Sequence, residues 1–514
     1  MPKKRALTTA QTAVLLLVLM AIAKVLGFVR EMVLAGYFGA GSITDAFVMA
    51  QSIPNTFVAF VLSAASTAFM PIYSQKYEQE GEAQANLFAS ELLNFQLVFI
   101  AIVTVAGLLF TKPIVSFFAP GYSAETAELT CYYMRAALFV LFFTACLNVL
   151  GAVLEYKGTF VAQNLIGLLQ NTCVIVFIII SAYTDYKLMI YGLVAGNALR
   201  LLFESLVAKK KGYKYTPSFR LSKPLKAAAV LALPVLVSGS FSEINWFIDR
   251  MLGSTLAEGS VSALNYGSMV VTTLASLTGG IGATLIYPKL NKAYARGDNA
   301  EVSKLSETGI NLVSLICVPL TLGSMVYSTQ IVQIIYERGA FAEAATSATS
   351  KAFFFYVIGL AFTCITTIIS RVFFTLHDTL TPAIWGAAAV LINIGLNFAL
   401  VKPMGLSGLA LATSLSGFAG TVMQALAFRK KHPEVTLITS GKKLCLIFLF
   451  SAISVGGSYA GYVLFAKLGL GKIVTLLLAV VLAVAIYLGL MYVARFEELK
   501  IIKTLIKKDE QSEN

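Results

Sequence analysis

The sequence predicts an all-α polytopic membrane protein of about 14 transmembrane helices, and two observations lead to this fold class. Hydrophobic residues make up 58% of the 514 positions and charged residues only 13%, which is about half the charged share of a typical soluble chain. Apolar stretches of roughly 20 residues, long enough to cross a bilayer as helices, recur from one end of the chain to the other. The short alternating segments that a closed membrane barrel requires are not found.

The predicted spans follow one another with short polar connections. The first begins directly after a basic N-terminal segment without a small-residue cleavage site, so we expect no cleaved signal peptide. The spans cover residues 11–38, 43–73, 86–111, 126–154, 159–182, 187–208, 224–254, 260–290, 304–329, 344–375, 380–401, 405–428, 443–466 and 472–494.

The distribution of Lys and Arg predicts that both termini lie in the cytoplasm. An even number of spans places the termini on one side, and 26 of the 39 Lys and Arg residues fall in the tails and loops of that side. Seven fall in the opposite loops and six within spans. The positive-inside rule assigns the basic side to the cytoplasm. The net charge of +13 is therefore a topology signal, and we expect no nucleic acid among the partners.

An internal repeat predicts two parallel-repeat six-helix lobes followed by two C-terminal helices. The segment REMVLAGYFGAGSITDAF aligns with DRMLGSTLAEGSVSALNY at an offset of 217 to 218 residues, where Gly41 matches Gly259. Because six is an even number of spans, both lobes keep the same orientation and should be related by an axis along the membrane normal. The predicted domains are an N-lobe (1–208), a basic cytoplasmic linker (209–223), a C-lobe (224–431), spans 13 and 14 (432–494) and a cytoplasmic tail (495–514).

Charged residues interrupt the first two spans between residues 24 and 55. Lys24, Arg30, Glu31 and Asp45 lie there among apolar residues. A charge near the bilayer centre costs at least ~2.5–3.5 kcal/mol, so we expect these side chains to face a polar cavity rather than lipid. Converging cations suit a multivalent anion, because guanidinium groups hold phosphate oxygens through paired hydrogen bonds. We predict an anion site here and include Asn55, at the end of the stretch, among its residues.

Arg250 should enter the same cavity from the seventh span, which matches the first span in the repeat. Arg200 and Arg371 lie within about two turns of a cytoplasmic end, a position typical of side chains that snorkel to the interface. The carboxylates leave two interpretations open. Glu31 and Asp45 could hold the cations while the site is empty, or Asp45 could cap its own helix through the sequence GSITD.

A second group of polar residues lies in spans 7, 11 and 12. Asn393 and Asn397 are four positions apart and share one helix face. Together with Glu243 and Thr413 they offer oxygen ligands that suit a hard cation. Hydrogen bonding between helices is the competing interpretation, and spacing alone favours it.

Catalytic motifs are absent from the sequence. We find no HExxH, phosphate-binding loop or GxSxG sequence, and the six cysteines lie in apolar stretches without CxxC spacing. We therefore expect a transporter without a cofactor rather than an enzyme.

Several motifs together resemble the MurJ (MviN) lipid II flippases of the MOP transporter superfamily. They are KVLGFVRE, GAGSITDAF, IPN and AFMPIYSQ in the first lobe, IDRMLGSTLAEGSVSALNY in the second, RGAF at 338–341 and LHDTLTPA at 376–383. The resemblance implies two six-helix lobes and a final helix pair associated with a lateral groove for a lipid tail. It also implies that an undecaprenyl-pyrophosphate-linked peptidoglycan precursor moves from the inner to the outer leaflet of a bacterial plasma membrane by alternating access.

By matching motif positions, Lys24 stands where this family commonly has Arg, while Arg30 and Asp45 match directly. Asn393, Asn397 and Thr413 resemble a sodium site of some members, in which Asn397 replaces a carboxylate. Two departures concern cavity arginines of some members. Their places are taken here by Val58 or Ala59 and by Met269, and we expect Arg250 to supply the missing charge.

The expected partners are the lipid-linked glycan, the bilayer and cell-wall synthesis proteins, with Na⁺ or the membrane potential as the driving force. Two alternatives stay open. One is an exporter of another lipid-linked oligosaccharide, such as an exopolysaccharide or teichoic-type unit. The other is a small-molecule/cation antiporter of the same fold.

Overall fold

A computed structural model describes residues 9–437 and 441–496 of the chain. Every regular element in these ranges is a helix, which confirms the predicted all-α class. The predicted tail, 495–514, lies outside the described residues except for its first two positions. The helices form two compact units, one of residues up to Asn265 with Arg338–Ala345, and one of Tyr266–Glu337 with the residues from Thr346 onward.

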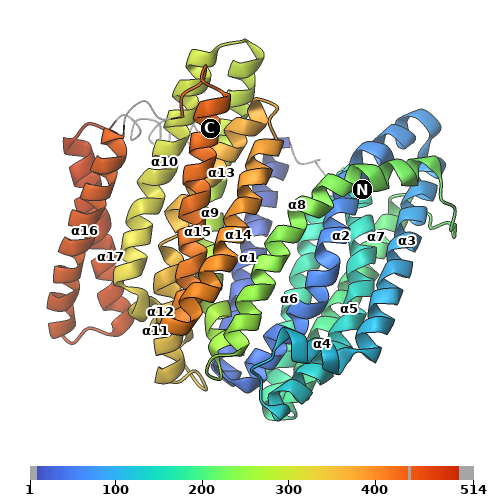
Figure 1. Ribbon diagram of the computed structural model, residues 1–514, viewed down its shortest axis with the longest axis horizontal. Helices are drawn as coiled ribbons and strands as arrows, with labels where there is room; N and C mark the ends of the chain where they lie inside the picture. Colours follow the sequence, from blue (N-terminus) through green and yellow to red (C-terminus); the bar gives the residue numbers. More distant parts are fainter. Residues whose placement is uncertain (1–8, 438–440, 497–514) are drawn as a thin grey trace, which may run out of the picture. The chain divides into compact units, whose positions relative to one another are not determined.

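The first unit contains eight α-helices and one 3₁₀ turn (Figure 1). The buried faces of α2 and α5 form its core, where Phe47 packs edge-on against Tyr133. The elements are α1 (Thr9–Phe38), α2 (Ser42–Glu80), α3 (Glu82–Leu109), α4 (Thr111–Phe118), α5 (Ala124–Tyr156), α6 (Phe160–Tyr183), η1 (Tyr186–Leu188), α7 (Met189–Lys210) and α8 (Lys223–Ser254).

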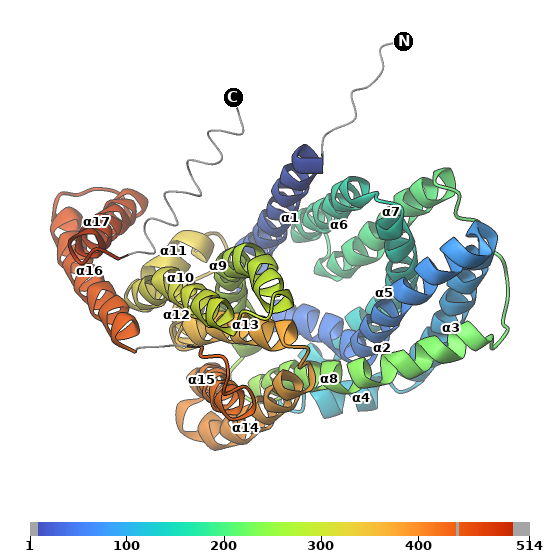
Figure 2. The ribbon, with the colours of Figure 1, turned by 90° about the horizontal axis from the view of Figure 1, so that it is seen from above.

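The second unit contains the remaining helices, apart from the first residues of α9 and α12, which belong to the first unit. Its last two helices, α16 and α17, lie side by side next to α10 in both views (Figures 1 and 2). The hydroxyl of Tyr487 on α17 donates to the backbone oxygen of Leu315 on α10 at 2.9 Å. The elements are α9 (Ser260–Ala295), α10 (Asn299–Val326), α11 (Ser328–Tyr336), α12 (Glu343–Val357), α13 (Leu360–Thr375), α14 (Leu380–Met404), α15 (Leu406–Lys431), α16 (Lys442–Lys467) and α17 (Lys472–Val493).

Ten helical segments in the described ranges are long and apolar enough to cross a membrane, with α12 and α13 counted as one. The other long helices, α1, α2, α8 and α9, have 30, 39, 32 and 36 residues. At 1.5 Å per residue each exceeds the ~30 Å hydrocarbon core. The count of fourteen stays a prediction.

The order of the helices repeats with the offset seen in the sequence. Helices α3 and α10 each have 28 residues, start at Glu82 and Asn299, and are followed by the short helices α4 and α11. The compact units and the predicted lobes divide the chain differently at α8. That helix opens the predicted C-lobe, yet it packs against α2 within the first unit, where Leu225 and Ala228 join a cluster around Phe69 and Tyr73.

Candidate functional site

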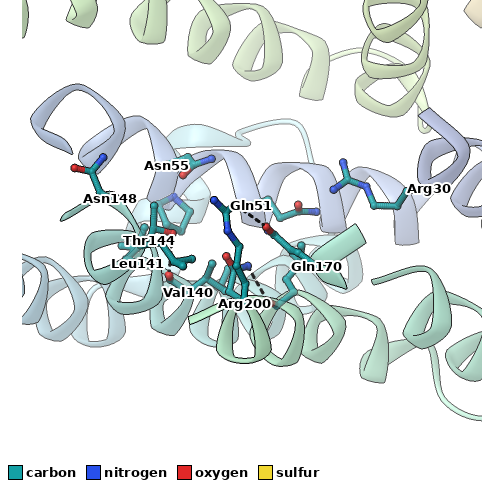
Figure 3. A pocket seen from close by; sticks show the side chains of 14 residues that line it. Arg30, Gln51, Asn55, Val140, Leu141, Thr144, Asn148, Gln170 and Arg200 are labelled. Atoms are coloured by element: carbon teal, nitrogen blue, oxygen red, sulfur yellow. Dashed lines mark hydrogen bonds between the residues drawn. The ribbon is translucent and has the colours of Figure 1, made fainter. Parts of the chain in front are cut away.

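Two adjoining polar cavities lie inside the first unit. The larger, about 520 Å³, is enclosed by α2, α5, α6 and α7, with Arg30 of α1 at one end (Figure 3). The smaller, about 330 Å³, extends toward α8. Both are lined by Arg30, Gln51 and Asn55, so these side chains join the cavities into one polar path. Burying polar groups without hydrogen-bond partners is unfavourable. The polar side chains of this path are therefore suited to contact water or a polar ligand.

Arg30 and Glu31 form an ion pair at the junction of the cavities. The Nη2 atom of Arg30 lies 2.7 Å from Oε1 of Glu31, and Nε lies 3.2 Å from the same oxygen. Asn265 donates to the other carboxylate oxygen at 3.3 Å. The Glu31 side chain is 8% exposed and that of Arg30 is 26% exposed. The Nη1 atom of Arg30 also donates to Oδ1 of Asn171 at 3.4 Å. Glu31 thus balances the charge of an arginine that lines both cavities.

Arg250 lines the smaller cavity together with Glu243, both on α8. Its guanidinium carbon lies 5.5 Å from the centre of the Trp246 ring, a cation–π contact that fixes the group at the cavity wall. Arg30, Glu31, Asn55 and Arg250 therefore all line the smaller cavity.

Lys24 lies elsewhere. It is exposed on α1 and lines neither cavity. Six residues separate it from Arg30, and at 100° per residue this turns Lys24 about 240° around the helix axis. The two cations thus occupy different faces of α1.

Asp45 also lines neither cavity, and it caps a helix other than its own. Its buried carboxylate accepts hydrogen bonds from the backbone N–H groups of Gly259 at 2.8 Å and Ser262 at 2.7 Å, and from the Ser262 hydroxyl. These donors belong to the start of α9. In return Oε1 of Glu258 accepts from the backbone N–H of Ser42 at the start of α2. Each loop therefore satisfies orphan donors of the other helix, an outcome that differs from both interpretations of Asp45 that the sequence left open.

The close approach of these loops requires glycine at position 259. Gly259 has φ +83°, and a Cβ atom there would lie 2.4 Å from the backbone oxygen of Ala40. The matching of Gly41 with Gly259 in the sequence repeat therefore has a structural cause at the second position.

Arg200 is a cavity residue that its sequence position did not indicate. Its Nη1 donates to Oε1 of Gln170 at 3.2 Å, and its Nε donates to Oε1 of Glu204, which is fully buried, at 2.8 Å. Figure 3 shows the side chain reaching from α7 between Gln51 and Gln170, with Asn148 farther along the cavity. The position of Arg200 near the end of its span had suggested that its side chain snorkels to the membrane interface. The informative signal was Glu204 four residues later, because a carboxylate in an apolar helix requires a partner on its own face.

The predicted sodium ligands fall into two groups. Asn393, Asn397 and Thr413 form one hydrogen-bonded cluster, in which Nδ2 of Asn397 donates to Oδ1 of Asn393 at 2.7 Å and Nδ2 of Asn393 donates to Thr413 at 3.3 Å. They belong to the second unit, whereas Glu243 lines the smaller cavity of the first. The cluster matches the pattern of hydrogen bonding between helices.

A third cavity, of about 430 Å³, lies in the second unit and is apolar. Residues of α10, α11, α16 and α17 line it, among them Leu320, Val455, Val480 and Leu488. An apolar hollow beside the last two helices is the feature that the family resemblance associates with a lipid tail.

The fold and these cavities define a class of protein, a polytopic helical membrane transporter with a cation-lined polar path. Its fold is similar to those of two solved membrane transporters. A lipid II flippase MurJ in an inward closed conformation matches with a TM-score of 0.79 at 23% identity, over 93% of this chain and 98% of that one. An inward-facing multidrug resistance MATE family transporter matches with a TM-score of 0.62 at 17% identity, over 81% of this chain and 98% of that one.

Sequence comparison identifies the family. The model described as "Lipid II flippase MurJ" matches residues 34–480. Relatives named "Probable lipid II flippase MurJ" include one from Rickettsia prowazekii, 26% identical over 95% of this chain and 98% of its own length. Another, from Vibrio cholerae, is 27% identical over 80% of each chain. The chain belongs to the lipid II flippase MurJ family, which confirms the resemblance seen in its motifs.

Proposed function

We propose that this protein translocates lipid II, the undecaprenyl-pyrophosphate-linked peptidoglycan precursor, from the inner to the outer leaflet by alternating access. Family membership supports the substrate. The observation that carries the mechanism is the lining of one polar path by the guanidinium groups of Arg30, Arg200 and Arg250. A pyrophosphate offers several acceptor oxygens, which fixed guanidinium groups can hold in parallel pairs.

The ion pair of Arg30 with Glu31 suggests how the cation is balanced before a substrate binds. A pyrophosphate replaces Glu31 as the partner of the cation, so binding exchanges one charge-assisted contact for another. The headgroup then crosses along the polar path, while the lipid tail stays in the bilayer or in the apolar hollow beside α16 and α17. The protein's part is binding and guiding charge, and no bond of the substrate changes.

The same proposal places both termini in the cytoplasm, on the basis of the asymmetry of Lys and Arg. It takes the membrane potential or Na⁺ as the driving force. The cluster of Asn393, Asn397 and Thr413 would be the Na⁺ ligands, and cell-wall synthesis proteins would be the partners that supply and consume the substrate.

The alternative substrate is another lipid-linked glycan. It is favoured by the departures from the arginines of some family members, since Val58 is buried in the core of the first unit and Met269 carries no charge. Pyrophosphate recognition is common to both substrates, so the cavity alone does not separate them.

Depletion of the protein in a strain that depends on it, followed by analysis of lipid-linked intermediates, tests the substrate. Lipid II should accumulate on the inner side while other carrier-linked glycans reach the outer face normally. Accumulation of a different glycan with normal lipid II flux would overturn the proposal. In the same strain, Arg30→Ala and Arg250→Ala should each abolish growth, with Arg429→Ala, at the end of α15, as the matched control. Full growth of both cavity variants would contradict a role of the cavity in transport.

A further inference from the structure

The connection between α7 and α8 is a fixed segment rather than a free linker. We call residues 211–222 the strap. Figures 1 and 2 show it running along the outside of α3. Asn86 of α3 donates to the backbone oxygen of Gly212 at 3.0 Å, and Asn94 donates to that of Ser218 at 2.8 Å. Side chains of α3 therefore satisfy backbone groups of a segment that has no secondary structure of its own.

A buried carboxylate holds the far end of the strap. Glu91 is 3% exposed, and it accepts hydrogen bonds from the hydroxyl groups of Ser218 and Ser222. The hydroxyl of Tyr215 donates to Oδ1 of Asn94 at 2.7 Å. Because a buried carboxylate is costly unless its oxygens are hydrogen-bonded, Glu91 fixes the two serines that flank Phe219–Leu221.

The contacts also fix the depth of the strap relative to the membrane. They advance along α3 from Asn86 to Asn94, a rise of roughly 12 Å in a helix. Glu91 is the last charged residue of α3, and an uncharged, mainly apolar stretch follows from Leu92 to Leu109. Since 18 such residues nearly span the hydrocarbon core, Glu91 marks the boundary with the headgroups. The strap lies at the same boundary.

The surface that the strap presents combines apolar and cationic side chains. Phe219 is 68% exposed and Leu221 is 63% exposed. At the level of the headgroups such apolar side chains can face lipid instead of water. Arg220 lies between them, and Lys223 follows at the start of α8; both are exposed. Residues 211–226 contain no acidic side chain. Exposed aromatic and aliphatic groups interleaved with cations are typical of segments that bind an anionic membrane surface.

We propose that the strap is a binding surface for anionic phospholipid headgroups of the leaflet on its side of the membrane. Phe219 and Leu221 insert at the level of the headgroups, and Arg220 and Lys223 contact the lipid phosphates. Glu91 acts through the serines as a positioning residue. This site is separate from the cavity and from the transported lipid, and it gives α8 a fixed starting point in the membrane.

The test uses the full chain in nanodiscs with Phe219→Trp as a reporter, corrected for the two native tryptophans by parallel measurement of the parent. Brominated phosphatidylglycerol or brominated phosphatidylcholine is added at the same mole fraction. The reporter should be quenched by both, and more strongly by the anionic lipid, with a preference that falls as salt is raised. Adding Arg220→Gln with Lys223→Gln should cut that preference on the order of tenfold.

The matched control carries Arg429→Gln and Lys430→Gln, two cations at the end of α15. In the Phe219→Trp background it should keep the full preference. Equal quenching by the two lipids, absence of quenching, or an equal loss of preference in the control would each overturn the proposal. Size-exclusion profiles identical to that of the parent show that the variants remain folded. Transport activity is measured separately, so a wrong substrate assignment leaves this result intact.

Discussion

The carboxylate of Asp45 accepts a hydrogen bond of 2.7 Å from the backbone N–H of Ser262, 217 residues further along the chain. This separation lies within one residue of the offset at which the sequence repeats. The start of α2 and the start of α9 are therefore equivalent segments that cap each other, through Asp45 in one direction and Glu258 in the other.

Replacing Asp45 with Asn should destabilise the protein, because one amide oxygen cannot serve all the donors that the carboxylate accepts. We expect a loss of about 1–2 kcal/mol in the free energy of unfolding, the usual range for a helix cap. Thermal unfolding in detergent measures it. Asp185→Asn, which alters the exposed cap of η1, should change the midpoint little. An unchanged midpoint for Asp45→Asn would contradict the capping role.

Arg30→Lys should retain part of the transport activity that Arg30→Ala loses. Lysine keeps the charge near Glu31 but lacks the planar fork that holds two oxygens at once. The measurement is the rate at which lipid II becomes accessible on the outer face of vesicles containing equal amounts of each variant. Equal rates for the Lys and Ala variants would show that the charge of Arg30 plays no part.

Arg200→Ala should destabilise the first unit more than the replacement of a cavity-lining side chain that has no buried ionic partner. It leaves the fully buried Glu204 without its cation, and breaking such a pair costs about 3 kcal/mol at the low end of the observed range. Adding Glu204→Gln should recover most of the loss, because a neutral amide is cheaper to bury. The unfolding midpoints of the single and double variants decide this. A double variant no more stable than Arg200→Ala would refute the explanation.

Asp378, in the connection between α13 and α14, should contribute stability that depends on pH. Burial raises the pKa of its carboxyl group, but hydrogen bonds from Lys431, Thr381 and His432 outweigh burial and hold the pKa well below its usual range. A carboxyl group with a depressed folded pKa stabilises above its unfolded pKa of about 3.9, and that contribution is lost as pH falls below this value.

The variant Asp378→Asn tests this dependence. Its unfolding midpoint should lie below that of the parent at pH 7, and the difference should shrink once the pH falls below about 4. Glu434→Gln, which removes a more exposed carboxylate beside His432, is the control and should show little difference at either pH. A gap between Asp378→Asn and the parent that stays constant with pH would contradict the depressed pKa.

The fold could be predicted because hydropathy, charge asymmetry and the internal repeat each act over many residues. The sequence pointed to cavity residues where a cation lay deep in a span, as for Arg30 and Arg250, which both line the smaller cavity. Lys24 shared that pattern, but its rotation around α1 turned it away, and depth alone says nothing about the face of a helix. The partner of Asp45 depends on the meeting of two loops far apart in the sequence, which local patterns do not contain.

Because Glu91 fixes the strap where α8 begins, a tilt of α8 about that end would be magnified at its other end. Arg250 lies 27 residues from Lys223, or roughly 40 Å along the helix. A tilt of about 10° at the fixed end would move the guanidinium group sideways by about 7 Å. This exceeds the 2.7 Å between the charged atoms of the Arg30–Glu31 ion pair. The contacts at the start of α8 would in that case bear on the position of Arg250, which lies at the far end of the same helix.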